Sequence, residues 1–408
     1  MQGGKGVKFA LWFRGRVEIL GSHKSVAVGA VSRYGLGMTQ TDPFELFFAV
    51  PPGLETALCN EARDKGFDNP QAVPGGVVTQ GDWSDVWRAN LVMRGASRVL
   101  VRIGSFRVFH LAQLDKRARK FPWAETLRPD IPLRVDVTCR RSKVYHAKAA
   151  SERIERALSE ELGAKIDPKA ALCVKIRIED DLCTISIDTS GEALHKRGHK
   201  EAVGKAPMRE TMAALFLRQS GYTGQEPVMD PMCGSGTFVL EAAEIAAGLN
   251  PGRSRHFAFE DLASFDAVAW EQVRSETQVL TPKHQFYGSD RNPGAIEMSQ
   301  ANAIRAGVGD YCTFHHHAIS DMTRPDGPPG LVIVNPPYGA RIGNKKLLYA
   351  LYGSFGQVLK ERFTGWRAAI ITSDTGLAKA TGLPFLPLEQ PVAHGGIKVR
   401  LFQTAPLR

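Results

Sequence analysis

Short apolar runs followed by helical stretches repeat through the second half of the chain, and this alternation constrains the fold more than any other feature. The run Leu331–Val334, for example, precedes a helical stretch that begins near residue 347. Strands that alternate with helices are typical of a mostly parallel sheet covered by helices. We therefore expect a doubly wound α/β domain over residues 193–408. Its strands are predicted at 227–230, 286–290, 331–334 and 367–372.

Residues 42–192 follow a different pattern, in which strands and helices mix with short loops. Apolar and polar residues alternate from Arg98 to Phe106, which is typical of a half-buried strand. This mixture predicts a compact α+β region. The basic, Gly-containing segment 191–206 is interpreted as a linker, and residues 1–41 as a disordered arm or an over-long annotated start. Further strands are expected at 44–50, 133–139, 173–178 and 183–188, and helices at 54–65 and 149–162.

The first half of the chain carries nearly all of the net charge of +10. Residues 1–200 hold 32 basic and 23 acidic side chains, whereas residues 201–408 hold 20 and 19. Residues 101–150 alone hold 12 basic and 4 acidic side chains. A local excess of this kind favours a surface that binds a polyanion such as nucleic acid. The candidate RNA-binding residues are Arg98, Lys116, Arg117, Arg140, Arg141 and Lys143.

Other classes of protein fit the composition poorly. The six cysteines form no C-x-x-C pair, which argues against a zinc ribbon, a thioredoxin site and a secreted disulfide framework. No apolar run approaches the roughly 20 residues needed to span a bilayer. The apolar run at 9–13 is shorter than the ~7–15 residues of a signal-peptide core. We expect a cytoplasmic protein without a membrane partner.

A loop with two glycines follows the first predicted strand of the α/β domain. Ligands of open α/β sheets bind in this position, and glycines allow the backbone to approach them closely. Position 239 is Val, where a dinucleotide fingerprint needs a third small residue, so a nucleoside cofactor without a pyrophosphate fits better. For the loop alone, a packing turn is the alternative. The candidate cofactor-binding residues here are Asp230, Cys233, Gly234, Ser235 and Gly236.

An acidic residue ends the second predicted strand. Asp290 can accept hydrogen bonds from both ribose hydroxyls of a nucleoside, and Arg291 follows it directly. Alone, an acidic residue at this position is weak evidence, because it can occur there by coincidence. Together with the glycine loop at the same sheet edge, it predicts a nucleoside pocket.

The third predicted strand ends in Asn335-Pro336-Pro337-Tyr338, which we identify as the candidate catalytic residues. An exocyclic base amine has its lone pair delocalised into the ring, so an enzyme that methylates it must hold the amine and accept its two hydrogens. The side-chain oxygen of Asn335 and the backbone carbonyl of Pro336 can do so. The consecutive prolines restrict φ, and Tyr338 offers a face on which a base turned out of its helix can stack. The alternative is a proline turn after a core strand.

These motifs, in this order, resemble class I S-adenosylmethionine (SAM)-dependent methyltransferases that act on a base amine. The wider set resembles the THUMP-domain RNA guanine-N2 methyltransferases, in particular those of bacterial 23S ribosomal RNA. The resemblance covers about residues 44–404. It is carried by Leu194–Gly198, Ala206–Glu210, D-P-M-C-G-S-G-T-F, N-P-P-Y-G-A-R-I-G and Gly365–Ser373.

The resemblance implies a Rossmann-like SAM domain whose last strand is antiparallel, preceded by a ferredoxin-like and THUMP region that grips RNA. It assigns SAM contacts to Asp230, Gly234, Gly236 and Asp290. His317 stands where enzymes of this class often carry an adenine-binding acid, so Asp321 or a backbone amide would have to replace it. The implied function is SAM-dependent methylation of guanine N2 in structured RNA, most simply 23S ribosomal RNA.

Three alternatives stay open on the sequence alone. The substrate could be transfer RNA, or the enzyme could be a DNA adenine-N6 methyltransferase, which shares N-P-P-Y. The chain could also be a non-catalytic RNA-binding assembly factor. No metal is expected: His315, His316 and His317 alternate along a strand, so at most two of them could converge on one ion.

Overall fold

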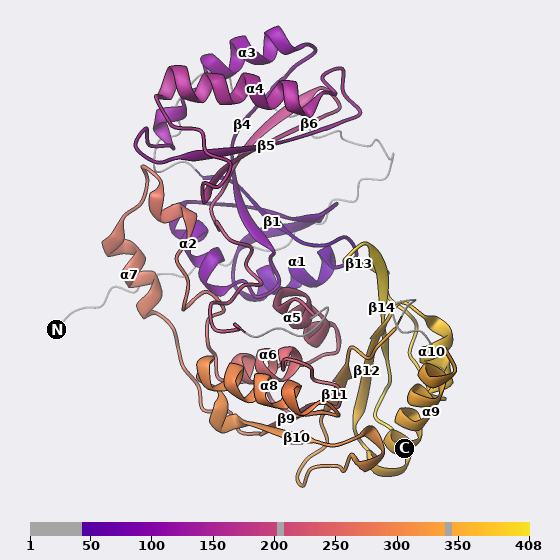
Figure 1. Cartoon of the computed structure of the whole chain (residues 1–408). Coiled ribbons are helices and arrows are strands. Elements are labelled where there is room, and N and C mark those ends of the chain that lie inside the picture. The colour runs from indigo at the N-terminus through magenta and orange to yellow at the C-terminus, as the bar shows by residue number, and fades with distance from the viewer. Residues whose placement is uncertain (1–42, 202–207, 339–344) are drawn as a thin grey trace, which may run out of the picture. The chain divides into compact units, whose positions relative to one another are not determined.

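The computed structural model of the chain describes residues 43–201, 208–338 and 345–408. The arm expected at 1–41 therefore lies outside the described residues, as do parts of two motifs, Ala206-Pro207 and the stretch from Gly339 to Gly343. The described elements form two seven-stranded sheets with helices packed on them (Figure 1). We call residues 43–190 the front unit, residues 191–201 the junction and residues 208–408 the back unit.

The front unit is a single sheet with strand order β2-β3-β1-β4-β7-β6-β5. All neighbours are antiparallel except β5 and β6. The strands are β1 (Phe44–Ala49), β2 (Asp68–Val73), β3 (Gly76–Gly81), β4 (Arg98–Arg107), β5 (Leu133–Arg140), β6 (Leu172–Glu179) and β7 (Leu182–Asp188). The helices are α1 (Glu55–Asp64), α2 (Trp83–Val92), α3 (Leu111–Arg119) and α4 (Ala147–Ala157). The predicted helix at 149–162 is α4 followed by one π-helical turn, Leu158–Leu162.

The central strand β4 joins the two halves of the front sheet. Its alternation of apolar and polar residues buries Val99, Val101 and Ile103, as predicted. Residues 98–102 pair with β1, and residues 100–107 pair with β7. The front unit is therefore continuous from β2 to β5.

The back unit has the strand order β10-β9-β8-β11-β12-β14-β13. The first five strands are parallel and β14 is antiparallel to β12, which confirms the predicted fold class. The strands are β8 (Val228–Asp230), β9 (Phe286–Asp290), β10 (Cys312–His316), β11 (Leu331–Val334), β12 (Arg367–Thr372), β13 (Val392–His394) and β14 (Ile397–Gln403). The helices are α5 (Glu210–Gln219), α6 (Thr237–Ala246), α7 (Ala267–Ser275), α8 (Pro293–Arg305), α9 (Lys345–Arg362) and α10 (Thr375–Ala380).

The order of the parallel strands determines where a ligand can bind. The chain leaves β8 for β9 on one side and later returns to β11 on the other side of β8. Ligands of open α/β sheets bind at such a switch point, beyond the carboxyl ends of the strands. Across the described ranges, we find no helix whose length and apolar character would let it cross a bilayer.

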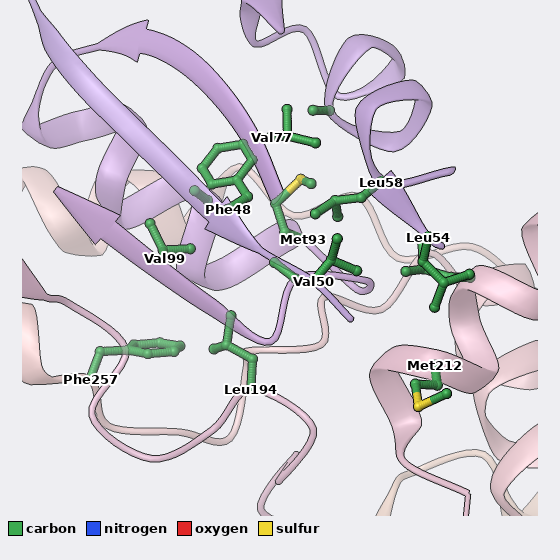
Figure 2. Packing of buried hydrophobic residues seen from close by; sticks show 14 of the residues in the cluster. Phe48, Val50, Leu54, Leu58, Val77, Met93, Val99, Leu194, Met212 and Phe257 are labelled. Carbon is green, nitrogen blue, oxygen red and sulfur yellow. The ribbon is translucent and has the colours of Figure 1, made fainter. Parts of the chain in front are cut away.

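Apolar side chains of both units and of the junction belong to one buried cluster. Figure 2 shows part of it, with Phe48 and Leu54 of the front unit, Leu194 of the junction and Met212 of α5. All four side chains are at most 2% exposed. The cluster therefore runs through the junction rather than stopping on either side of it.

A buried network of charges lies beside this cluster. Arg94, in the turn between α2 and β4, donates to Glu241 and Glu244 of α6 at 2.9 and 3.1 Å. Arg197 of the junction donates to Glu241 at 3.0 Å and to the Arg94 carbonyl at 2.8 Å. His199 Nε2 lies 3.1 Å from Glu244. Burial raises the pKa of Glu244, but the neighbouring positive charges outweigh burial and hold this pKa below its ordinary value.

The interpretation of 191–206 as a linker is wrong for the part that the structure describes. Arg197 is 2% exposed and His199 is 6% exposed, so the junction is packed into the molecule. The reason is that Glu241 and Glu244 are buried and need positive partners, which the junction supplies. A local excess of Gly and basic residues is compatible with a linker, but here the basic residues belong to the core.

We expect Arg94→Ala to destabilise the whole chain, because it leaves two buried carboxylates short of a positive partner. Removing one partner of a buried ion pair costs about 3–5 kcal/mol of unfolding free energy. The matched control is Arg128→Ala, which removes an arginine from an exposed pair with Asp130 and should change stability little. Denaturant unfolding measures both variants. Equal effects would contradict the role given to Arg94.

Candidate functional site

The loop between β8 and α6 has the backbone conformation expected of a ligand cradle. Gly234 and Gly236 have φ values of 55° and 84°, in the left-handed region that favours glycine. A Cβ built on Gly234 would meet no atom within 4 Å, so this part of the backbone faces open space. Gly236 is the N-cap of α6. The loop thus leaves open space at the half-buried Gly234, just before the start of a helix, where a cofactor can approach closely.

Two carboxylates organise this loop. Asp230 ends β8, is 2% exposed and accepts a hydrogen bond from the Met232 amide at 3.0 Å. Burial, together with the nearby charge of Asp290, raises the pKa of Asp230 to about 8. Asp290 ends β9 and accepts from the amides of Gly234 at 3.1 Å and Asn292 at 2.9 Å. Asp290 therefore links the glycine loop to the neighbouring strand end.

The side chains of Cys233 and Ser235 point into the protein rather than toward a ligand. They are 6% and 3% exposed, and Cys233 Sγ lies 3.8 Å from Ser299 Oγ. Burial raises the pKa of the Cys233 thiol, which keeps it neutral. We therefore limit the predicted cofactor contacts of these two residues to their backbone atoms.

Two residues of α8 that the sequence analysis missed hold the loop in place. Ser299 donates to the Gly234 carbonyl at 2.9 Å, and Asn302 donates to the Ser235 carbonyl at 3.1 Å. Both side chains are fully buried. The sequence signal for this role is two polar residues, three positions apart, on the buried face of α8.

The three histidines lie at the end of β10, and one of them, His316, lies close to Arg291. The His316 Nε2 lies 3.1 Å from the Arg291 carbonyl, and the rings of His315 and His317 stack with centroids 6.0 Å apart. Asp321 follows in an exposed single turn. Among the residues that the structure describes, no three His, Cys, Asp or Glu side chains converge as metal ligands would.

The candidate catalytic segment extends from a strand that is buried along its whole length. All four residues of β11 are buried between β8 and β12. The next side chain is Asn335, whose Oδ1 is buried and has no hydrogen-bond partner within the described ranges. Pro336 is buried, and Tyr338 is partly buried. Burial raises the pKa of Tyr338, so its hydroxyl stays protonated.

Tyr352 of α9 supports this segment and was not identified from the sequence. It is 1% exposed, and its hydroxyl donates to the Pro337 carbonyl at 3.3 Å. The same hydroxyl lies 3.4 Å from Thr372 Oγ1 at the end of β12. Nothing local in the sequence indicates this role, because the contact depends on how α9 packs on the sheet.

The structure separates one predicted RNA-binding residue from the others. Arg98 donates to Asp188, which is fully buried, at 2.6 Å, and to the Gly191 carbonyl at 2.7 Å. Its charge compensates a buried carboxylate while its side chain stays 29% exposed, so Arg98 has a structural role and its contact with RNA stays a prediction. The alternating pattern around Arg98 does not indicate that its partner is Asp188, which is 90 residues away.

The other predicted RNA-binding residues lie on α3 and at the end of β5. Arg140 and Arg141 have side chains that are 70% and 61% exposed, and Lys143 is also exposed. Lys116 is exposed on α3, where the Arg117 guanidinium lies over the Phe106 ring at 5.5 Å. These five cations stay candidates.

Comparison with protein families finds one match in the front unit and one that covers most of the back unit. Residues 197–388 match the RMKL-like methyltransferase domain, and residues 45–100 match the RlmL ferredoxin-like domain. The first match contains the glycine loop, Asp290 and the Asn335 segment. The second contains β1 to α2 and the start of β4.

Solved structures show the same arrangement over nearly the whole chain. A predicted N6-adenine-specific DNA methylase from Listeria monocytogenes is 28% identical, with a TM-score of 0.81 over 90% of this chain and 97% of that one. SMU.472, solved in complex with SAH, is 26% identical, with a TM-score of 0.82 over 91% of this chain and all of that one. TrmN from Thermus thermophilus, at 20% identity, shares the fold with a TM-score of 0.70 over 89% of this chain and 100% of its own.

We expect Asp290→Ala to weaken SAM binding by roughly 2–4 kcal/mol, because it removes charge-assisted hydrogen bonds to the ribose and the link to Gly234. Calorimetry with SAM measures the loss. Asp266→Ala is the matched control, since Asp266 caps α7 and contacts no part of the loop. Unchanged affinity in Asp290→Ala would remove this residue from the cofactor site.

A second prediction concerns the pH dependence of stability. The pKa of Asp230 is about 8 in the folded protein, above its ordinary value of 3.8, so folding favours the protonated form. The contribution of this carboxyl to the free energy of unfolding is fully present below about pH 4 and is lost as the pH rises through 8. Thermal unfolding should therefore show wild type losing stability over this range relative to Asp230→Asn. Parallel curves for the two proteins would contradict the raised pKa.

Proposed function

We propose that this chain, a SAM-dependent methyltransferase with an RMKL-like catalytic domain and an RlmL ferredoxin-like domain, methylates the exocyclic N2 amine of guanine in structured RNA. The proposed substrate is 23S ribosomal RNA. One observation carries the proposal: at the sheet edge that also holds the glycine loop, Asn335 presents a buried oxygen that has no partner among the described residues. A buried acceptor is costly to leave unpaired, so its position suits an amine that arrives with the substrate.

The residues at this edge fit the cofactor. Its ribose and amino acid groups would lie against Asp290, Asp230 and the backbone of Gly234 and Gly236, with Arg291 and Asp321 beside them. The open space at Gly234 supports this assignment. The raised pKa of Asp230 supports it too, because the buried carboxylate has no positive partner of its own within the described ranges and the charged amino group of the cofactor would stabilise it. When bound, SAM supplies a methyl group on a positively charged sulfur.

The Asn335 segment would prepare the nucleophile. In the flat amine, the nitrogen lone pair is shared with the guanine ring and attacks poorly. Asn335 Oδ1 and the Pro336 carbonyl would accept its two hydrogens, and these bonds strengthen as the nitrogen becomes tetrahedral and gains positive charge. Tyr338 would stack on the base. Tyr352 positions the segment through the Pro337 carbonyl.

The front unit supports RNA as the substrate. It contains the match to the RlmL ferredoxin-like domain and the exposed cations of β5 and the following loop. The competing candidate is adenine N6 in DNA, because N-P-P-Y suits that amine too and the Listeria monocytogenes neighbour is a predicted DNA methylase. Transfer of labelled methyl groups to total RNA and to genomic DNA, from a strain lacking the protein, distinguishes the two.

We predict that Asn335→Ala lowers turnover on RNA by about 100-fold or more, since it removes an acceptor that acts mainly in the transition state. SAM and RNA affinities should stay close to wild type. Asn335→Asp keeps an acceptor in place and should retain part of the activity. If Asn335→Ala turned over like wild type, the segment would be a proline turn and the mechanism would be wrong.

A further inference from the structure

The loop between β5 and α4 exposes aromatic side chains that the catalytic proposal does not use. Tyr145 is 70% exposed, and Phe109, just before α3, is 41% exposed. The Tyr145 ring packs against His146 with centroids 4.1 Å apart and an interplanar angle of 41°. We call Phe109, Tyr145 and His146 the aromatic platform. Large apolar rings exposed together on a surface are typical of an interaction site.

The backbone beneath the aromatic platform is held at several points. Val144 is 3% exposed and anchors the loop between two exposed neighbours, Lys143 and Tyr145. Asp181, in the β6–β7 turn, accepts from the Lys143 amide at 2.8 Å, and its carbonyl accepts from the Val108 amide at 2.8 Å. The segments that carry the rings are thus joined before any ligand binds, which lowers the entropy cost of binding.

Exposed cations lie in and beside the loop that carries Tyr145, next to the carboxylates of Glu179, Asp180 and Asp181. The Lys143 ammonium lies 4.9 Å from the centre of the Phe109 ring, and Lys143 has no carboxylate within ion-pair distance in the described part of the chain. The Arg140 side chain is 70% exposed and 3.8 Å from Glu179, whereas Arg141 is paired with Glu179 and Asp180. Rings flanked by cations match a ligand that has both flat bases and phosphates.

We propose that the aromatic platform stacks unpaired bases of a single-stranded RNA segment while Arg140 and Lys143 contact its phosphates. In a duplex, the base faces are already stacked on one another, so an exposed ring can bind only bases that are unpaired or splayed out. An apolar protein partner would cover Tyr145 but leave Lys143 without a counter-charge, and it would not use the exposed Arg140. The inference rests on the proposed function, because it specifies the form of RNA that the front unit recognises.

Fluorescence anisotropy with a short labelled single-stranded RNA and an RNA duplex of the same composition tests this inference in the full-length protein. Tyr145→Ala should weaken single-strand binding by about 5- to 100-fold, the range for loss of one base–aromatic stack, and should affect the duplex little. Tyr145→Phe keeps the ring and should bind like wild type. Ile304→Ala is the matched control, since Ile304 is 72% exposed on α8.

Salt dependence separates stacking from charge. Lys143→Gln should reduce the slope of log affinity against log salt by about 0.7, as expected for one phosphate contact to a single strand. Tyr145→Ala should lower affinity at every salt concentration and leave that slope unchanged. If Tyr145→Ala bound the single strand like wild type, or if Tyr145→Phe lost as much affinity as Tyr145→Ala, the proposal that the aromatic platform stacks bases would be wrong. Persistent methyl transfer to RNA in those variants would show that the proposed function survives.

Discussion

The pairing of Arg94 with two buried glutamates of α6 is the constraint on which the rest of the structure depends. Glu241 and Glu244 would be prohibitively costly to bury without positive partners. Arg94 of the front unit and Arg197 of the junction are two of these partners, and Arg253 of the back unit is a third. The helix α6 begins at the glycine loop, so the same helix that carries the candidate cofactor loop is fixed to the front unit. A neutral, apolar contact could be as stable, but it would not specify the register between these elements as closely as directed ion pairs do.

The candidate site is built where three parallel strands end side by side. β8 contributes Asp230, β9 contributes Asp290, and β11 contributes the Asn335 segment. Helices hold the segments that follow two of these strands: α8 holds the loop after β8 through Ser299 and Asn302, and α9 holds the segment after β11 through Tyr352. The site also keeps a buried acceptor unsatisfied, since Asn335 Oδ1 has no partner in the described part of the chain. Leaving such an atom unpaired costs about 1–3 kcal/mol, which a bound amine would recover.

The sequence predicted those features that depend on local pattern. The strands around Val101 and Ile333 followed from alternation and from a continuous apolar run, and the loop at Gly234 followed from its place after a strand. Features that depend on distant partners were missed or misassigned. The sequence did not reveal the partners of Arg197 and Arg98, because Glu241 and Asp188 are 44 and 90 residues away along the chain. Tyr352 was missed for the same reason, since its partner Pro337 belongs to another element.

We propose that Asn335 Oδ1, which has no partner in the part of the chain that the structure describes, receives the exocyclic amine of a guanine in RNA. The most direct test of this proposal is mass spectrometry of nucleosides after the purified protein has acted on RNA and on DNA, with SAM that carries a deuterated methyl group. The account predicts labelled N2-methylguanosine in ribosomal RNA from a strain lacking the protein, and no label in DNA. Labelled N6-methyladenosine in DNA, with unlabelled RNA, would contradict it.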